Sequence, residues 1–209
     1  RNQTQVNSDL LGAAPKLKRV IVRHVTEAAA QRLLLEKGDV DVASDLNPDQ
    51  IQAIAGKPEL KVVQIPRGTV YYLALNTANP NLAKPEVWQA MHWLIDYDGI
   101  ANQLFRGQYK VNQTPLGSGT VGALTDKPYK LDVAKAKSLL AKAGFPDGFS
   151  ISIDVMSASP YREISQSIQS TFAQAGIKLE LRLGEPSQVL TRYRERRHDM
   201  LVFIWAPDY

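Results

Sequence analysis

The sequence predicts an α/β fold whose strands are at least partly parallel. In the last third of the 209-residue chain, strand patterns alternate with helix patterns, which is typical of helices packed on a sheet. Hydrophobic residues make up 44% of the chain and charged residues 22%, and this ordinary balance excludes disorder, collagen and coiled coil. No apolar run approaches the roughly 20 residues that a membrane-spanning helix needs.

The first third of the chain carries two helix patterns and several short strand patterns. A helix is predicted over 27–37, because Ala, Leu, Glu, Gln and Lys dominate it and Gly38 is a suitable stop. A second, short helix opens at Asn47 and Pro48, where a capping side chain precedes a first-turn proline, and it runs through Ile54. Valine, isoleucine and leucine predict three strands, at 19–23, 40–42 and 60–63.

The middle of the chain opens on a strong strand pattern. Residues 70–75 are nearly all apolar, so we expect a strand that is buried on both of its faces. Val87 and Met91, with the apolar residues that follow them, recur at helical spacing and predict a helix over 87–95. Residues 107–130 hold many Gly, Pro, Thr and Asn, which predicts a long irregular segment of a kind that is often functional or linking.

The last third gives the clearest pattern. A helix is predicted over 132–143, capped by Asp132 and stopped by Gly144. Period-two alternation and i, i+4 spacing then predict strand 149–155, helix 164–172, strand 177–183, helix 186–197 and strand 200–205. Ligands of an α/β layer sit beyond the carboxyl ends of its strands, and this chain stops at Tyr209, just past its last strand. We therefore expect a fragment that holds only part of a ligand cleft.

Charge and cysteine content narrow the function classes. The 25 basic and 21 acidic residues give a net charge of +4, which is a small excess. The dense cluster of arginines between 192 and 197 is interpreted as the solvated basic end of a helix, because no nucleic-acid motif accompanies it. We expect no nucleic-acid partner. Cysteine is absent, which excludes disulfide scaffolds, cysteine-based zinc sites, iron–sulfur clusters and cysteine nucleophiles.

The sequence offers no anchor for catalysis. The segment 117–119 (GSG) falls in a loop rather than at a strand-to-helix turn, so it is not interpreted as a phosphate-binding loop. No Gly-x-Ser-x-Gly nucleophile elbow occurs. The three histidines are far apart, and the pairing of His92 with Asp96, one helical turn on, is interpreted as a side-chain contact rather than a metal site. We therefore predict no catalytic residue, no metal and no cofactor.

Five segments, in order along nearly the whole chain, resemble one known family. They are 12–20; 35–43 (LEKGDVDVA); 72–77 (YLALNT) with 84–91 and 95–97; 132–140 with 143–145; and 204–209 (IWAPDY). Each segment is short, but their order makes the set specific. On these segments the chain resembles the family 5 extracellular solute-binding proteins, the peptide- and nickel-binding components of ABC importers.

The resemblance implies a fold, a function and a location. Family members have a two-lobed, periplasmic-binding-protein-like (class II) fold, in which lobes of mixed sheet flanked by helices close on a ligand. By this comparison residues 1–69 are part of the first lobe, residues 70–209 are the N-terminal part of an incomplete second lobe, and the crossing lies near 67–72. The protein would capture peptides in the interlobe cleft and deliver them to an ABC transporter permease without chemical change. We expect it in the periplasm, or outside the cell on a lipid anchor, as a monomer when full length.

The resemblance also implies which residues contact the ligand. Asp208 occupies the place of an aspartate that pairs with the α-ammonium of a bound peptide, and a buried ammonium needs such a charged partner. Trp205 would form an apolar wall of the pocket, although a strand tryptophan fits a core equally well. Tyr209 matches a tyrosine that lines the site of nickel-binding relatives. Tyr72 and Asn76, at the lobe crossing, are further candidates for ligand contact.

Other interpretations stay open. Arg162 is a candidate partner for the carboxylate of a peptide, by residue type and region only. Within the same family the ligand is alternatively nickel, a metallophore or a sugar. From other classes, the alternatives are a protein-interaction module and an α/β hydrolase-like enzyme, which needs a nucleophile with a positioned base. Turnover of generic esters would support the enzyme.

Overall fold

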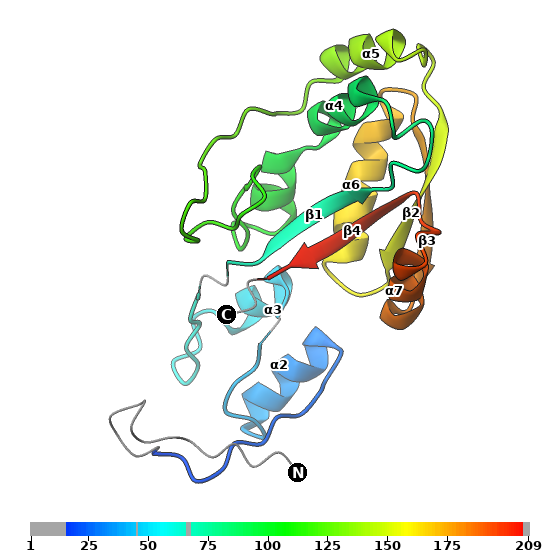
Figure 1. Ribbon diagram of the computed structural model, residues 1–209. Coiled ribbons are helices and arrows are strands. Elements are labelled where there is room, and N and C mark those ends of the chain that lie inside the picture. Colours follow the sequence, from blue (N-terminus) through cyan, green and yellow to red (C-terminus); the bar gives the residue numbers. More distant parts are fainter. Residues whose placement is uncertain (1–15, 45, 66–67, 207–209) are drawn as a thin grey trace. The chain divides into compact units, whose positions relative to one another are not determined.

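The computed structural model of the chain describes residues 16–44, 46–65 and 68–206 (Figure 1). The chain divides into two compact units, Arg1–Leu60 and Lys61–Tyr209. In the first unit, the two predicted helices are confirmed as α2 (Ala28–Lys37) and α3 (Pro48–Ile54). The predicted cap is also present, because the side chain of Asn47 accepts a hydrogen bond from the backbone N–H of Gln50 at 3.0 Å.

The three strands predicted for the first third of the chain are wrong. Residues 19–23, 40–42 and 60–63 belong to no strand, and most of their side chains are exposed, with Val22 90% exposed and Val42 81% exposed. A strand is stable only when a neighbouring strand satisfies its backbone N–H and C=O groups. Within the described residues, none of these three segments has such a neighbour.

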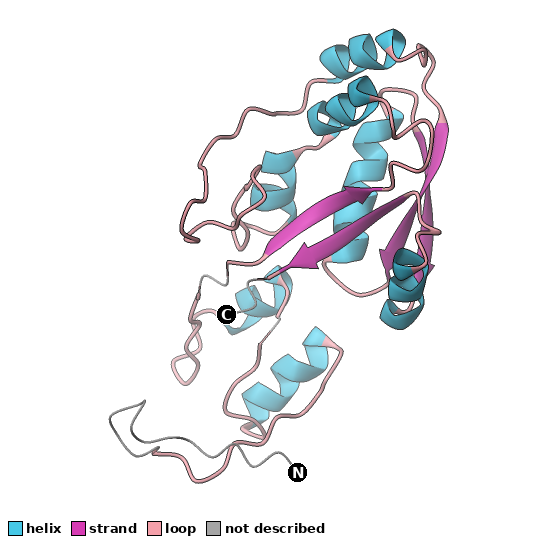
Figure 2. Cartoon of the chain, in the orientation of Figure 1, coloured by secondary structure: helices cyan, strands magenta, loops and turns pink. Residues whose placement is uncertain are grey.

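The larger unit is built on a four-stranded mixed sheet (Figure 2). Its strands are β1 (Val70–Leu75), β2 (Ser150–Met156), β3 (Lys178–Gly184) and β4 (Met200–Trp205). They lie in the order β1-β4-β2-β3. β2 is parallel to both β3 and β4, whereas β1 runs antiparallel to β4. The predicted α/β fold with partly parallel strands is therefore confirmed.

Helices cover both faces of this sheet. α6 (Tyr161–Ala173) packs on one face, behind the sheet in Figure 1, and α7 (Pro186–Arg194) packs on the other. We call these the α6 face and the α7 face. The described part of the larger unit has three further helices, which lie on the α6 face: α4 (Pro85–Leu94), the π-helix η1 (Gly99–Leu104) and α5 (Val133–Lys142). The sequence predicted all of them except η1, and the irregular segment 107–130 is also as predicted.

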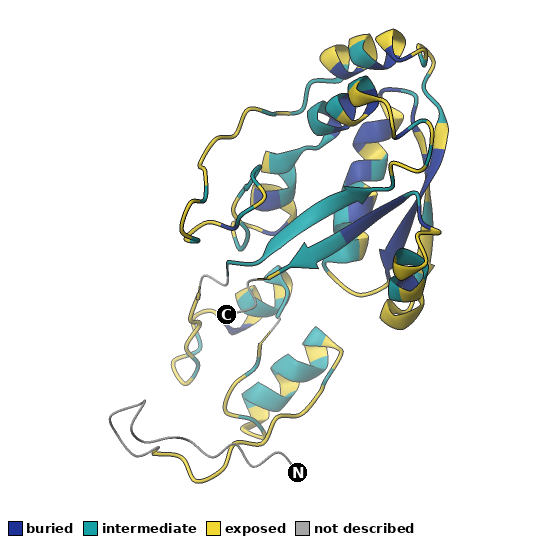
Figure 3. Cartoon of the chain, viewed as in Figure 1, coloured by how far each residue is buried: buried dark blue, intermediate teal, exposed yellow. Residues whose placement is uncertain are grey.

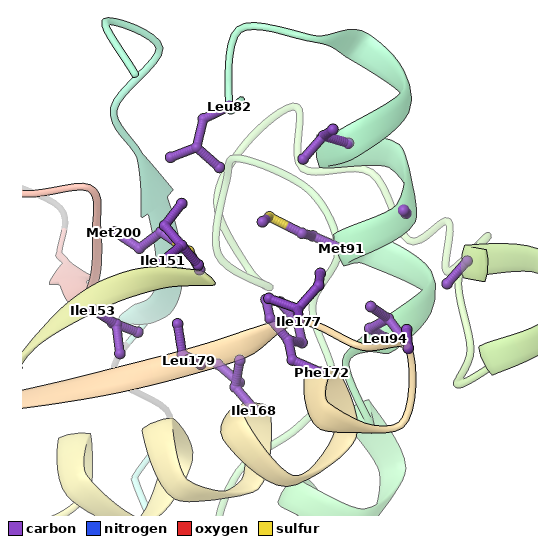
Figure 4. Close-up of a cluster of buried hydrophobic side chains, with 14 of the residues drawn as sticks. Leu82, Met91, Leu94, Ile151, Ile153, Ile168, Phe172, Ile177, Leu179 and Met200 are labelled. Atoms are coloured by element: carbon purple, nitrogen blue, oxygen red, sulfur yellow. The ribbon is translucent and has the colours of Figure 1, made fainter. Parts of the chain in front are cut away.

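The main hydrophobic core lies on the α6 face (Figure 4). Ile151 and Ile153 alternate along β2 and meet Ile168 and Phe172 of α6 and Met91 of α4. A smaller cluster on the α7 face consists of Met156, Val189 and Leu201. β2 is therefore buried on both faces, and six of its seven residues are buried (Figure 3).

β1 is less buried than its composition predicts. All six of its residues are half-buried, so the expectation of burial on both faces is wrong (Figure 3). The reason is position, because β1 is the edge strand of the described sheet. The irregular segment passes close to the start of β1: a Cβ on Gly117 would overlap the carbonyl oxygen of Gly68. Glycine is therefore required at this approach of two backbones.

The start of β4 is fixed by hydrogen bonds to one carboxylate. Asp199 accepts hydrogen bonds from the Ser152 hydroxyl at 2.5 Å and from the Asn79 side-chain amide at 2.9 Å. Burial alone would raise the pKa of Asp199, but these hydrogen bonds outweigh it, and the pKa lies below its ordinary value of 3.8. The ionised carboxylate thus ties β4 to β2 and to the loop that follows β1.

We expect Phe172→Ala to lower the free energy of unfolding by about 3–5 kcal/mol, because Phe172 is fully buried in the main core and its removal leaves a cavity. Urea denaturation of the purified protein measures this. Ser170→Ala, at an exposed position of the same helix, is the control and should change the free energy by less than about 0.5 kcal/mol. Equal effects of the two substitutions would contradict the described packing.

We expect Asp199→Asn to destabilise the protein by about 1 kcal/mol at neutral pH, because the carboxylate loses its charge-assisted hydrogen bonds. The folded-state pKa is depressed, so this contribution is complete above the ordinary carboxyl pKa and disappears as the pH falls through the folded value. Urea denaturation of both proteins from neutral to acid pH should show the difference shrinking. Asp126→Asn, at an exposed position, should show no such trend.

Candidate functional site

The carboxyl ends of the three parallel strands meet at one edge of the sheet. β2 ends at Met156, β3 at Gly184 and β4 at Trp205, and the antiparallel β1 begins at this edge with Val70 opposite Trp205. Ligands of α/β sheets bind outside the carboxyl ends of the strands. We take this carboxyl edge as the candidate functional site.

At this edge, β4 extends farther than its parallel neighbour. The last pair between them is Asp154 with Leu201, after which β2 continues for two residues and β4 for four. Among the described residues, the last residues of β4 therefore pair only with β1, and Trp205 is half-buried. An aromatic side chain at the end of such a projecting ribbon offers a large apolar contact surface.

Tyr72 and Trp205, two of the residues that the sequence singled out, lie on the same face of the sheet. Side chains alternate along a strand, and Tyr72 is opposite Phe203, so Tyr72, Phe203 and Trp205 all belong to the α7 face. The ring of Phe203 contacts Tyr72 edge-on at 6.2 Å and stacks with Tyr193 of α7 at 5.6 Å. We call Tyr72, Phe203, Tyr193 and Trp205 the aromatic floor.

The hydroxyls of Tyr72 and Tyr161 stay protonated at physiological pH. Burial, and then the neighbouring Tyr193, raise the pKa of Tyr72 above its ordinary value of 10.0. On the α6 face, burial, and then Tyr71, raise the pKa of Tyr161 to about 12. These groups are therefore neutral donors and acceptors of hydrogen bonds at physiological pH, and they are not poised to act as bases.

A second group of rings flanks the edge on the α6 face. Tyr71 contacts Tyr161 at 5.7 Å and Tyr109 at 5.5 Å, and Phe105 contacts Tyr109 at 4.6 Å, all edge-on. The sequence analysis missed Tyr161 as a site residue. The available signal was its position as the first residue of the helix that follows a parallel strand, which places it at the carboxyl edge.

Asn76 lies at the opposite end of the strand pair. It follows the last residue of β1, and the antiparallel register puts it beside the start of β4, six residues or about 20 Å from Trp205. Its amide nitrogen donates to the carbonyl oxygens of Arg196 at 3.0 Å and His198 at 2.8 Å. Arg196 has a positive φ of 55°, so Asn76 holds a turn in an uncommon conformation. Ligand contact by Asn76 stays a prediction.

The other predicted site residues are distributed as follows. Asp208 and Tyr209 lie outside the described residues. Arg162 lies in the first turn of α6, at the carboxyl edge, with an exposed side chain. The structure therefore brings Trp205, Tyr72 and Arg162 to one edge of the sheet, while Asn76 is at the other.

An ion pair beneath α7 was not foreseen. Asp154 of β2 is 1% exposed, and its Oδ1 accepts a hydrogen bond from the Nε of Arg192 at 2.6 Å. The interpretation of the 192–197 arginines as a solvated helix end is thus wrong for Arg192, although Arg194, Arg196 and Arg197 are exposed. The signal in the sequence was an aspartate in the middle of an apolar strand, which needs a partner when buried.

No metal site or membrane span is found in the part of the chain that the structure describes. His92 and Asp96 bind other partners: the Nδ1 of His92 lies 3.3 Å from the hydroxyl of Tyr97, and Asp96 accepts a hydrogen bond from the N–H of Gly99. A hollow of about 860 Å³ lies at the first residues of β2 and β3, beside the end of α6 and Asp199, and the aromatic floor does not line it.

Curated relatives with similar sequences are named for peptide binding. The "Probable D,D-dipeptide-binding periplasmic protein DdpA" of Escherichia coli (strain K12) is 28% identical over 95% of this chain. A dipeptide-binding protein of the same organism is 26% identical over 94% of the chain. The chain spans 39% and 38% of the lengths of these two relatives.

Solved structures show the same fold. The periplasmic binding protein DppA from Helicobacter pylori, in complex with the peptide STSA, is 27% identical, with a TM-score of 0.79 over 89% of this chain and 36% of that one. The binding protein AgaA from A. tumefacien R10, in complex with agropinic acid, is 28% identical, with a TM-score of 0.76 over 87% of this chain and 38% of that one. The fold is thus part of a class II periplasmic-binding-protein architecture.

One family model covers almost the whole chain. It is described as bacterial extracellular solute-binding proteins, family 5 Middle, and it matches residues 4–209. The match includes both compact units, β1 to β4 and the aromatic floor. The chain therefore belongs to the family 5 bacterial extracellular solute-binding proteins.

Proposed function

We propose that the chain is part of a solute-binding protein that captures short peptides between two lobes and delivers them to the permease of an ABC importer. The observation that carries this is the aromatic floor, which runs along the α7 face of the sheet to Trp205 at the carboxyl edge, where β4 extends past β2. The names of the relatives support a peptide as the ligand. In this proposal the ligand is bound and released unchanged, which the names of the relatives as binding proteins support.

The proposed contacts follow from residue chemistry. Trp205 and Tyr72 supply apolar contact with peptide side chains, in roomy surroundings that water can share. Asp208 pairs with the peptide's α-ammonium, and Arg162 is in a position to meet its carboxylate. The neutral hydroxyl of Tyr161 offers a hydrogen bond to the peptide backbone. Main-chain recognition of this kind supports broad specificity.

The proposal extends to organisation and location. Residues 1–69 belong to the first lobe and residues 70–209 to the second, with the crossing near 67–72. The full-length protein works as a monomer in the periplasm, or on a lipid anchor outside the cell, and its partner is the permease in the membrane. The periplasmic location of a named relative supports this placement.

Short peptides should raise the melting temperature of the full-length gene product. At about 100 times the Kd, a ligand that binds only the folded state adds about 2.7 kcal/mol to the free energy of unfolding. Differential scanning fluorimetry with a dipeptide, a D,D-dipeptide, a tetrapeptide, agropinic acid, a nickel complex and a sugar measures it. A higher melting temperature with peptides alone supports the proposal. A higher melting temperature with one of the other compounds alone means that this compound's class, and not peptides, is the ligand. No shift with any of them would contradict the proposal.

Trp205→Ala should weaken peptide binding by about tenfold or more, because aromatic anchors carry a large share of binding energy. Trp88→Ala is the matched control. Trp88 is 37% exposed on α4, outside the aromatic floor, so its loss should leave the Kd unchanged within about twofold. Isothermal titration calorimetry on the full-length protein measures both variants. An unchanged Kd in Trp205→Ala would remove Trp205 from the site.

A further inference from the structure

We propose that Asp154 and Arg192 form a positioning pair, which holds α7 at the one place where Tyr193 completes the aromatic floor. This inference rests on the proposed function, because it concerns the aromatic floor to which that function is assigned. Neither residue touches the ligand in this proposal. They act through Tyr193, whose ring stacks with Phe203.

A short hydrogen bond to a buried carboxylate restrains the side chain of Arg192. Asp154 is 1% exposed, and its Oδ2 has no hydrogen-bond partner among the described residues. Among these residues, the carboxylate therefore depends on the 2.6 Å hydrogen bond that Arg192 donates to Oδ1. An ionised carboxylate buried without its partner is strongly destabilising. Gly184, at the end of β3, leaves room for the guanidinium, because a Cβ there would lie 3.2 Å from its Nη2. The position of Arg192 on the sheet is therefore tightly constrained.

Tyr193 follows Arg192 directly, and successive residues of a helix point about 100° apart. Arg192 therefore reaches β2, while the ring of Tyr193 lies against Phe203 of β4 at 5.6 Å, with an interplanar angle of 19°. Val189, one turn earlier, is fully buried on the same face. Two contacts along α7, one apolar and one ionic, thus fix both the distance and the rotation of the helix.

The floor depends on this rotation. The ring of Phe203 contacts both Tyr193 and Tyr72, and Trp205 follows on the same face. A rotation of α7 that withdraws Tyr193 removes the support behind Phe203 and frees its ring to turn. Tyr72 then loses its edge-on contact, and the surface offered to a ligand changes without any change in a ligand-contacting residue.

A mutant cycle on the full-length gene product tests the pair. The variants are Arg192→Gln, Tyr193→Leu and their combination, with the exposed Arg194→Gln on the same helix as control. Peptide Kd is measured by calorimetry well below the lowest melting temperature of the set. We expect Arg192→Gln and Tyr193→Leu each to weaken binding by about fivefold, the combination to be no weaker than the worse single variant, and the control to match wild type.

A second readout needs no ligand. In ligand-free protein labelled on phenylalanine, the ring of Tyr193 shifts the NMR resonances of the Phe203 ring. Arg192→Gln should move these resonances toward the values seen in Tyr193→Leu, whereas Arg194→Gln should not. If Arg192→Gln does not fold, Asp154→Asn combined with Arg192→Gln replaces it, because this pair of changes leaves no buried charge.

The outcomes separate the inference from the proposed function. Unchanged Phe203 resonances in the folded Arg192 variant overturn the positioning role, whether or not a ligand is known. Shifted resonances support it even if no peptide binds the wild type, a result that would count against the proposed function alone. A lower melting temperature with unchanged Kd and unchanged resonances means that the pair only stabilises the fold. Multiplicative effects of the two substitutions on Kd mean that Arg192 and Tyr193 act separately, and they also overturn the positioning role.

Discussion

The burial of β2 on both faces is the constraint on which the larger unit depends. Its apolar residues, such as Ile153, require a helix layer on one side, and α6 and α4 supply it. Its polar residues are buried on the other side, where Ser152 and Asp154 are at most 2% exposed and need partners. Those partners are Asp199, at the start of β4, and Arg192 of α7. One strand thus places β4 and α7 by polar contacts and places α6 by apolar ones.

Local patterns in the sequence were enough to find every described strand and helix of the larger unit except η1. Caps such as Asp132, which accepts a hydrogen bond from the N–H of Lys135, and the alternation of residues 149–155 depend on near neighbours only. The strands expected at 19–23 and 40–42 show the limit of this method. Apolar, β-branched residues make a segment able to form a strand, but pairing requires a second segment that local composition cannot specify.

The candidate site was foreseen in part, for the same reason. Trp205 and Tyr72 come together on one face because β1 and β4 pair, and the resemblance to a known family had indicated both residues. Tyr161, at the start of α6, and Tyr193, in the last turn of α7, were missed because both belong to helices whose position depends on β2. Asn76 is close to Tyr72 in sequence, but the direction of β1 carries it to the far edge.

The pairing of β1 with β4 also sets an order of assembly. Val70 is opposite Trp205, so the pair joins positions 135 residues apart, and every other element of the larger unit lies between them in the sequence. Closing so long a loop is entropically costly until the intervening elements have folded. During synthesis, β1 leaves the ribosome early and waits without its partner until β4 follows. The aromatic floor therefore forms late. A chain that can bind a ligand through the floor is one in which β1 has already paired with β4.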